Sequence, residues 1–372
     1  MLDKKRRFQG LVVVGVLFLA MIGGLMPDPF AMPWPVVHHR KAAIGVLGRL
    51  ADFMNGMRAY SDANMNFAAS APLLRGLAEY EIGASSSPNV WIGRNDHLFF
   101  AGEQTTAQSG GTIYRQRRTL HFVDIAAILA RELARRGAKL VVAIPPNAQS
   151  VAIGDLPDWA KAHSPLEYDL AMEELRKRGI ETVDLKTPMV AKAHRRSLYL
   201  RTDTHWRTFG AVFAYNLVVS GAGHPEWKAD PATVRGPVAP IAAGDLARQM
   251  GIRPFLTDSG APLIPVPAGE WDKLDILRSP PFEGVFDTYA YARRGAKSGA
   301  RVLMLGDSFT QYFWLPLFER TDAERIGWMH HSNCTFDYAD VERFDPTLVI
   351  WVPTEREMPC PLTAWPAGLP HQ

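Results

Sequence analysis

The chain has 372 residues, 47% of them hydrophobic and 21% charged. This composition can fill a hydrophobic core and excludes a disordered or fibrous protein. The formal net charge is +3, and the basic run at residues 4–7 accounts for the excess, because the chain without this run and Asp3 carries 37 positive and 37 negative side chains. A neutral remainder excludes a broad basic surface, so we expect no nucleic-acid partner.

An uncharged apolar segment, residues 11–26, follows that basic run. With residues 8–10 it is about 20 residues long, enough to cross a bilayer. We therefore predict a signal anchor over residues 1–30 with its N-terminus in the cytoplasm, where the positive side chains stay. A cleaved signal peptide is the alternative, although the following MPDPFAMPWP contains no convincing small-x-small cleavage site. Both interpretations place the folded part outside the cytoplasm.

A Pro-rich spacer and a helical lead-in are predicted for residues 31–88. From residue 89 onward, buried apolar runs alternate with helical segments, which is typical of a mainly parallel sheet covered by helices on both faces. The predicted strands are residues 90–100 (with a turn), 138–146, 180–185, 301–309, 324–331 and 346–353, and the predicted helices are residues 117–137, 166–179, 206–223 and 311–320. The sequence thus predicts one α/β domain over residues 89–372.

Residues 225–297 are rich in Pro, Gly and Asp and have weak periodicity. We predict a long insertion there, of the kind that commonly carries binding surface.

The stretch GDSFT, residues 306–310, directly follows the apolar run RVLML. Ligands of open parallel sheets meet the loops at the carboxyl ends of the strands. This position would expose the Ser308 hydroxyl and aim free backbone N–H groups of the next helix at an oxyanion. Asp and Ser are also preferred N-caps, and a strand-to-helix turn needs one. The pentapeptide alone therefore supports a nucleophile and an N-cap about equally.

The stretch RTDTHWRTFG, residues 201–210, supplies the base that a serine nucleophile needs. Asp203 and His205 flank one residue, and in an extended segment both side chains point to one side. For this motif alone, a capping Asp beside a surface His is the more ordinary interpretation. The two motifs together predict a triad in which Ser308 is the nucleophile, His205 the base and Asp203 the carboxylate that orients it.

These motifs, together with VWIGRNDHLFF, GDLARQMG, HHSNCTF and LVIWVPTER, resemble the SGNH-hydrolase-like acetyltransferases of the alginate O-acetylation family, the AlgJ and AlgX group, over residues 89–356. The order DTHW, GDLA, GDSF is the specific signal, since ordinary SGNH esterases carry GDS first. The resemblance implies a three-layer α/β/α, flavodoxin-like sandwich with a circularly permuted motif order. Only some 20 residues follow the last predicted strand, so AlgJ is expected to be the nearer relative.

The resemblance also implies the function. It predicts an O-acetyltransferase that passes acetyl through a Ser308 acyl-enzyme to hydroxyls of an exopolysaccharide, alginate or similar. The implied partners are the polysaccharide acceptor and an AlgI-like, multi-pass membrane-bound O-acyltransferase as acetyl donor, with no cofactor and no metal. The implied location is the bacterial inner membrane, single-pass with a periplasmic catalytic domain, or the periplasm if the N-terminal segment is cleaved. The alternatives are a carbohydrate acetylesterase with the same triad and a non-catalytic polysaccharide-binding scaffold.

Further candidate residues surround the triad. The backbone N–H of Ser308 and the side chain of Asn333 are candidate oxyanion donors. Arg201 and Arg207 would give an anionic sugar polymer a basic rim, although helix-end arginines are often merely solvated. The aromatic candidates for stacking on sugar rings are Trp206 and Tyr312, although aromatics beside buried strands more often belong to the core.

The sequence contains two cysteines, Cys334 and Cys360. Outside the cytoplasm a single disulfide is permitted, and two buried free thiols are an equally supported alternative. The neighbouring His330 and His331 are interpreted first as packing at a strand end and only second as site residues.

Overall fold

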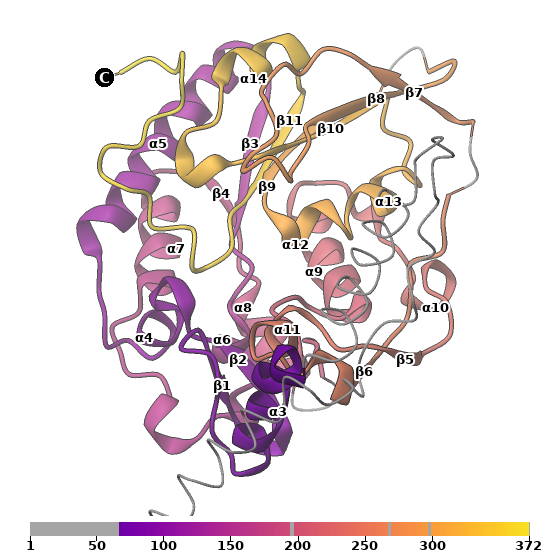
Figure 1. Ribbon diagram of the computed structural model, residues 1–372. Helices are drawn as coiled ribbons and strands as arrows, with labels where there is room; N and C mark the ends of the chain where they lie inside the picture. The colour runs from indigo at the N-terminus through magenta and orange to yellow at the C-terminus, as the bar shows by residue number, and fades with distance from the viewer. Residues whose placement is uncertain (1–66, 194–196, 267–268, 297–298, 372) are drawn as a thin grey trace, which may run out of the picture. The chain divides into compact units, whose positions relative to one another are not determined.

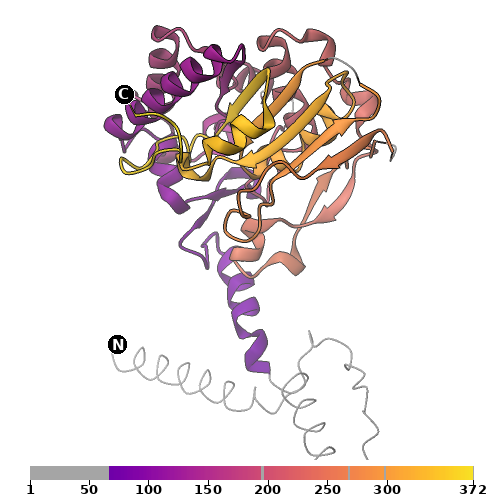
Figure 2. The ribbon, with the colours of Figure 1, turned by 90° about the horizontal axis from the view of Figure 1, so that it is seen from above.

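A seven-stranded sheet with helices on both faces organises the fold (Figures 1 and 2). The computed structural model describes residues 67–193, 197–266, 269–296 and 299–371. The predicted signal anchor and most of the predicted lead-in lie outside these residues. Within them, no helix combines the length and the apolar character that a membrane span requires.

The chain divides into two units, Met1–Ser86 and Ser87–Gln372. The first contains helix α3 (Phe67–Glu81), and the second contains the sheet and every other element described below.

The strand order in the main sheet is β4-β3-β11-β9-β10-β8-β7. The first five run parallel to their neighbours, whereas β8 pairs with β10, and β7 with β8, in antiparallel fashion. The bounds are β3 (Lys139–Ala143), β4 (Glu181–Val183), β7 (Trp271–Leu274), β8 (Tyr289–Arg293), β9 (Arg301–Gly306), β10 (Arg325–His330) and β11 (Leu348–Val352). Two small antiparallel ribbons stand apart, formed by β1 (Val90–Ile92) with β2 (Leu98–Phe100) and by β5 (Ala239–Ala242) with β6 (Thr257–Gly260).

Some helices of this unit cover the two faces of the sheet, and others pack against helices or against the small ribbons. Their bounds are α4 (Thr105–Ser109), α5 (Gln116–Arg135), α6 (Ala148–Val151), α7 (Glu167–Lys177), α8 (Lys186–Ala193), α9 (Thr208–Gly221), α10 (Pro231–Val234), α11 (Asp245–Gln249), α12 (Ser308–Gln311), α13 (Leu315–Phe318) and α14 (Tyr338–Phe344). Alternate strand residues enter two separate cores, one with α5, α7 and α14 and one with α9, α12 and α13. This two-sided burial explains the continuous apolar runs of β9 and β11, and the predicted three-layer α/β/α class with a mainly parallel sheet is confirmed.

Two local predictions differ from the structure. Residues 311–320 do not form one helix, because α12 ends at Gln311 and Pro316, which has no N–H to continue a helix, opens α13. The predicted insertion, residues 225–297, contains β7 and β8, which extend the main sheet. These strands are four and five residues long, too short for their alternation to stand out from the Pro- and Gly-rich turns around them.

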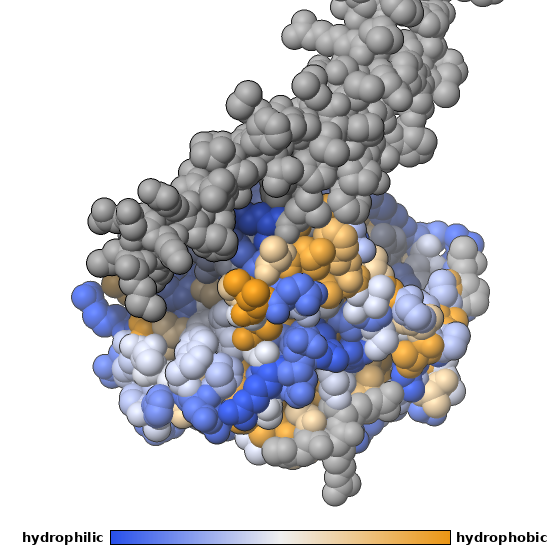
Figure 3. All heavy atoms as spheres, turned by 60° about the horizontal axis from the view of Figure 1, so that its bottom comes forward, coloured by the Kyte–Doolittle hydropathy of each residue, from blue (hydrophilic) through white to orange (hydrophobic). Residues whose placement is uncertain are grey.

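The surface of the domain is chemically mixed. On the face shown in Figure 3, hydrophobic side chains gather in patches that hydrophilic side chains separate. The hydrophobic side chains of this face therefore do not form one continuous surface.

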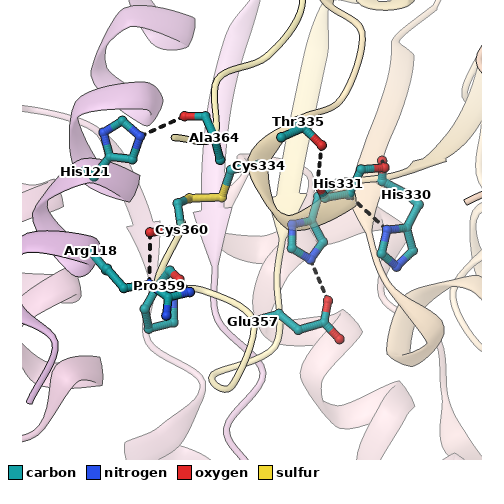
Figure 4. The surroundings of a disulfide bond; sticks show 11 residues. Arg118, His121, His330, His331, Cys334, Thr335, Glu357, Pro359, Cys360 and Ala364 are labelled. Carbon is teal, nitrogen blue, oxygen red and sulfur yellow. Dashed lines mark hydrogen bonds and ion pairs between the residues drawn. A yellow bond between two sulfur atoms is a disulfide. The ribbon is translucent and has the colours of Figure 1, made fainter. Parts of the chain in front are cut away.

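A disulfide joins Cys334, just after β10, to Cys360 in the C-terminal segment (Figure 4). Both cysteines are completely buried, and their Cα atoms are 5.8 Å apart. The same segment runs along α5, where Arg118 donates to the carbonyls of Pro359 and Cys360. The sequence supported a disulfide and two free thiols equally, and the structure contains the disulfide.

Removing this disulfide with Cys334→Ala and Cys360→Ala together is expected to destabilise the fold. The cysteines are 26 residues apart in sequence. Opening a loop of that length raises the conformational entropy of the unfolded chain and lowers the free energy of unfolding by about 3.5 kcal/mol. Urea unfolding of the double variant, and of the wild type with and without reductant, measures the loss. Equal midpoints for all three samples would contradict the prediction.

Candidate functional site

Ser308 lies at the turn where β9 ends and α12 begins. The N-cap of this turn is Asp307, whose Oδ1 accepts the N–H of Phe309 at 2.9 Å. The Asp307 Oδ2 accepts the N–H of Thr354 at 2.8 Å, which ties the turn to the loop after β11. Because Asp307 caps the helix, the Ser308 hydroxyl is free for another partner.

That partner is His205. Its Nε2 lies 2.8 Å from the Ser308 Oγ, and its Nδ1 lies 2.6 Å from the Asp203 Oδ1. The His205 and Asp203 side chains are 20% and 18% exposed. An ionised Asp203 accepts a hydrogen bond from the Nδ1–H of His205, which leaves Nε2 without a proton and able to accept the Ser308 proton. The structure therefore brings the three residues of the predicted triad into one hydrogen-bonded chain.

The electrostatics keep Asp203 ionised. Burial by itself raises the pKa of this carboxyl, but the hydrogen bond and charge of His205 and the N–H groups of His205 and Asp245 outweigh it. The net result is a pKa below the ordinary value for Asp. Asp203 is therefore charged at neutral pH, as an orienting carboxylate must be.

A second pair of residues, Gly244 and Asp245, packs against the Asp203–His205 segment and fixes its position by hydrogen bonds. The Asp245 N–H donates to the Asp203 Oδ2 at 3.1 Å. The Asp245 carboxylate in turn accepts the N–H of Thr204 at 2.8 Å and its hydroxyl at 2.6 Å. From the sequence, GDLARQMG was identified only as one of the stretches that resemble the family, and no role was predicted for it. The one pattern that could have indicated this contact is the Gly-Asp pair at the N-terminus of the short helix α11.

Gly244→Ala is expected to slow turnover by about 100-fold or more, because misplacing a catalytic group by about 1 Å costs that much. A Cβ at this position would overlap the Asp203 carboxylate. The matched control is Gly154→Ala, since a Cβ at Gly154 meets nothing within 4 Å. Steady-state kinetics and thermal unfolding of both variants check this. Wild-type turnover in Gly244→Ala would show that the close approach has no catalytic role.

A cavity of about 460 Å³ opens beside Ser308 and includes Asn333 in its wall. Pro359 and Pro361, which flank the disulfide cysteine Cys360, also line it. The bridge therefore fixes two walls of this cavity to each other, one from the end of β10 and one from the C-terminal segment.

Arg356 supplies a nearly buried positive charge to the same cavity. Its side chain is 11% exposed, and its nitrogens lie 3.6 Å from a Glu103 oxygen and 3.8 Å from a Glu357 oxygen, too far for hydrogen bonds. Its guanidinium carbon lies 5.2 Å from the ring centre of Phe309, the residue after Ser308. Sequence reasoning placed Arg356 in a matching stretch and assigned it no role.

His330 also lines the Ser308 cavity. Its ring stacks on Phe282 at 4.0 Å, and its Nδ1 accepts the N–H of Ser332 at 2.9 Å (Figure 4). Burial and the neighbouring His331 lower its pKa to about 3. The neutral ring therefore carries its proton on Nε2. His330 thus combines strand-end packing with a position on the site, and doubled histidines at the end of a strand were the only signal for it.

The His331 ring lies nearly parallel to the His330 ring, with 5.2 Å between their centres, and its Nε2 pairs with the Glu357 carboxylate at 2.8 Å (Figure 4). Burial opposes ionisation of Glu357, but the hydrogen bond and charge of His331 lower its pKa to about 2. Asp307, by contrast, has a raised pKa because it is buried beside the Glu357 charge. Ionisation is thus concentrated on Glu357.

Two groups of side chains bring metal-ligand atoms within 4.8 Å of one another. One contains Asp203, His205 and Asp245, and the other contains Asp307, His331 and Glu357. In both groups the carboxylates already accept hydrogen bonds from the protein. The geometry described here therefore requires no ion to hold it.

The structure separates the other candidate residues. Tyr312 is 58% exposed and presents its edge to the His205 ring at 6.1 Å, where a ligand can reach it. Trp206 is completely buried against Phe309 and Trp314. The prediction that Trp206 stacks on a sugar is wrong, because neither of its faces is accessible.

The two arginines of the predicted rim also differ. Arg207 donates to Asp258 at 2.9 Å and to the Tyr199 carbonyl at 3.0 Å. These contacts make it a structural residue, contrary to the prediction of a free basic rim. Arg201 is exposed, with its guanidinium 3.9 Å from Asp96, and it does not line the cavity beside Ser308. Asn333 is exposed in that cavity, as an oxyanion donor must be.

Residues 90–262 match the family described as "SGNH hydrolase-like domain, acetyltransferase AlgX". Among curated proteins, the chain is similar to "Probable alginate O-acetylase AlgJ" of Pseudomonas aeruginosa, with 30% identity over 135 residues, 36% of this chain and 33% of that protein. The protein of the same description from Pseudomonas putida is 27% identical over 197 residues, 51% of this chain and 48% of that one. The chain thus spans only a third to a half of the length of these relatives.

Among solved structures, the "O-Acetyltransferase Domain of Pseudomonas putida AlgJ" has a TM-score of 0.45 and 17% identity, over 73% of this chain and 92% of that one. Bacillus cereus PatB1 has a TM-score of 0.47 and 13% identity, over 73% and 98%. Ser308 lies beyond the matched family segment, whereas Asp203, His205 and Gly244 lie within it. Residues 90–262 therefore match the AlgX family of SGNH hydrolase-like domains, and the predicted resemblance of this chain to the AlgJ and AlgX group is confirmed.

Proposed function

We propose that this protein is an O-acetyltransferase that acetylates hydroxyls of an exopolysaccharide, alginate or a similar polymer, through a Ser308 acyl-enzyme. The observation that carries the proposal is the continuous hydrogen-bonded chain from Ser308 through His205 to Asp203 at the carboxyl end of β9. The names of the AlgJ relatives support the acetyl group and the polymer.

In the first half-reaction, the Ser308 Oγ attacks the carbonyl carbon of the acetyl donor while His205 Nε2 takes the serine proton. The tetrahedral intermediate collapses, the donor group leaves with that proton, and acetyl remains on Ser308. In the second half-reaction, His205 Nε2 takes the proton of a sugar hydroxyl, whose oxygen attacks the acetyl carbonyl. Collapse forms the sugar ester and returns the proton to Ser308.

The oxyanion of both intermediates needs hydrogen-bond donors. The backbone N–H of Ser308 is one proposed donor, because it has no acceptor among the described residues. The Asn333 side chain is the second proposed donor, since it is exposed in the cavity that Ser308 lines.

The proposed location and donor follow from the N-terminal segment and the disulfide. The buried disulfide between Cys334 and Cys360 fits an oxidising compartment such as the periplasm. The predicted anchor would hold the domain at the inner membrane, where an AlgI-like membrane-bound O-acyltransferase would present acetyl to Ser308. The sequence has no motif for binding coenzyme A or a nucleotide, which supports this route.

Hydrolysis is the competing reaction. The His205 and Asp203 side chains are partly exposed, so water can reach the base and compete with a sugar hydroxyl for the acyl-enzyme. A carbohydrate acetylesterase is therefore the second candidate function.

The two functions are separated by incubating the full chain in detergent with p-nitrophenyl acetate, with and without alginate oligosaccharides. The transferase is expected to form acetylated oligosaccharide and to release less free acetate when the acceptor is present. Acetate release that is independent of acceptor, with no acetylated product, would establish the esterase instead.

A further inference from the structure

Two cavities meet at the Ser308–His205 hydrogen bond. The cavity beside Ser308 measures about 460 Å³, and a second cavity of about 410 Å³ is lined by His205 and Asp203. The two cavities have no lining residue in common. The nucleophile and the base of the proposed reaction thus open onto different spaces.

Acyl transfer needs this kind of division. During the second half-reaction Ser308 carries acetyl and has no proton to donate, so His205 Nε2 is available for a new hydroxyl. That hydroxyl must approach His205 while the acetyl group occupies the Ser308 side. The second cavity, which His205 lines, is the space through which an acceptor can come.

The lining of the His205-side cavity suits a sugar that carries a carboxylate. Tyr312 offers an exposed ring next to His205, and aromatic rings of this kind stack on sugar faces. The Arg248 side chain is exposed there and has no hydrogen-bond or ion-pair partner among the described residues. Arg253 adds a second guanidinium, held by its Nε to the Ala243 carbonyl at 2.9 Å.

The carboxylate oxygens of this cavity already accept hydrogen bonds from the protein. Asp203 accepts from His205, and Asp245 accepts from Thr204. The two arginines are therefore the groups in this cavity that can donate to an incoming carboxylate, and a guanidinium binds a carboxylate with two parallel hydrogen bonds.

The Ser308-side cavity is unsuited to an anionic sugar. Four acidic side chains line it, those of Glu103, Glu283, Asp307 and Glu357. The pKa of Glu357 is lowered by its partner His331, so this group adds a negative charge to the cavity. Its arginines are engaged, since Arg115 is bound by Glu167, Arg118 by main-chain carbonyls, and Arg356 lies between two of the carboxylates. Its apolar wall consists of Phe282, Phe286, Pro359 and Pro361.

We propose that the acceptor is a carboxylate-bearing sugar that binds in the His205-side cavity, with its ring on Tyr312 and its carboxylate at Arg248, while the acetyl donor uses the Ser308-side cavity. This assignment rests on the proposed acetyltransferase function. Arg248 and Tyr312 then determine acceptor binding, and they have no role in the acetylation of Ser308, which uses the other cavity.

The variants that test it are Arg248→Gln, Arg248→Lys and Tyr312→Leu. Acetyl-enzyme formation is followed as the p-nitrophenol burst from p-nitrophenyl acetate, and transfer is followed with oligomannuronate and with neutral cello-oligosaccharide. Arg248→Gln is expected to raise the KM for oligomannuronate at least 10-fold more than it changes the burst rate or transfer to the neutral acceptor. Arg248→Lys restores part of the loss, and Tyr312→Leu weakens both acceptors. Arg131→Gln, an exposed arginine on α5, is the matched control.

Binding of oligomannuronate to the Ser308→Ala protein, by calorimetry, gives a readout that needs no turnover. Arg248→Gln in that background is expected to weaken binding at least 10-fold. Unchanged affinity, or equal losses for charged and neutral acceptors, would overturn the inference and leave the acetyltransferase standing. If Ser308→Ala keeps the wild-type burst, the proposed function fails, and that outcome does not depend on Arg248.

Discussion

Ser308→Ala is expected to remove acetyl-enzyme formation and to lower turnover by about 10⁴- to 10⁶-fold, the range seen when the nucleophile of a Ser-His-Asp triad is deleted. The hydroxyl that accepts acetyl is lost, and His205 Nε2 loses its partner at 2.8 Å. The fold should be unaffected, because Asp307 and not Ser308 caps α12. The measurements are the burst amplitude with p-nitrophenyl acetate and covalent labelling by a sulfonyl fluoride, which modifies activated serines.

The control is Ser220→Ala, on α9, whose hydroxyl only donates to the Asn216 carbonyl of its own helix. This variant should keep the wild-type burst and label. In cells, polymer acetylation that survives Ser308→Ala but disappears on deletion of the gene would refute catalysis by Ser308. The protein would then be a non-catalytic scaffold of the acetylation complex.

The site was predictable from the sequence where the signal was local. The spacing of Asp203 and His205 in an extended segment placed both side chains on one side, and the structure has them hydrogen bonded. The same alternation sends the next residue, Trp206, to the opposite side, where it is buried. The rule that identified the base therefore also excluded Trp206 as a sugar platform.

Other features depend on contacts that are distant in sequence. The role of Gly244 follows from its contact with Asp203, 41 residues earlier in the numbering, and no local pattern reveals such a contact. The sequence predicted Arg207 as a free basic side chain, because its partner Asp258 is 51 residues away in the chain. The choice between a disulfide and two thiols depended on whether the ends of β10 and the C-terminal segment approach each other, which only the tertiary fold decides.

The fold class was easier to predict from the sequence than the outer strands of the sheet. Central strands are buried on both faces, so β9 and β11 are continuous apolar runs that the sequence reveals directly. Strands β8 and β7 are the last two at one end of the sheet, and their mixed exposure gives a weak pattern. Ser308 could be located because it directly follows β9, a central strand.

Asp203→Asn is expected to lower the rate of acetyl-enzyme formation by about 10⁴-fold, which is the effect of replacing the orienting carboxylate of a Ser-His-Asp triad by an amide. The amide carries no charge to stabilise the His205 imidazolium, and it can donate to Nδ1 and so favour the wrong tautomer. Asp245→Asn is the matched control. Its contact with Asp203 runs through the backbone N–H, which the substitution retains, so its loss should be far smaller.

The pH dependence separates charge from mere geometry. The folded-state pKa of Asp203 is lowered, so its stabilising contribution is present above the unfolded pKa of about 3.9 and is lost only as pH falls through the lower folded value. Between pH 5 and 9 the wild-type rate should therefore show no step from Asp203, and the deficit of Asp203→Asn should persist across the whole range. A deficit under tenfold, or one that Asp245→Asn matches, would show that the Asp203 charge does not drive the reaction.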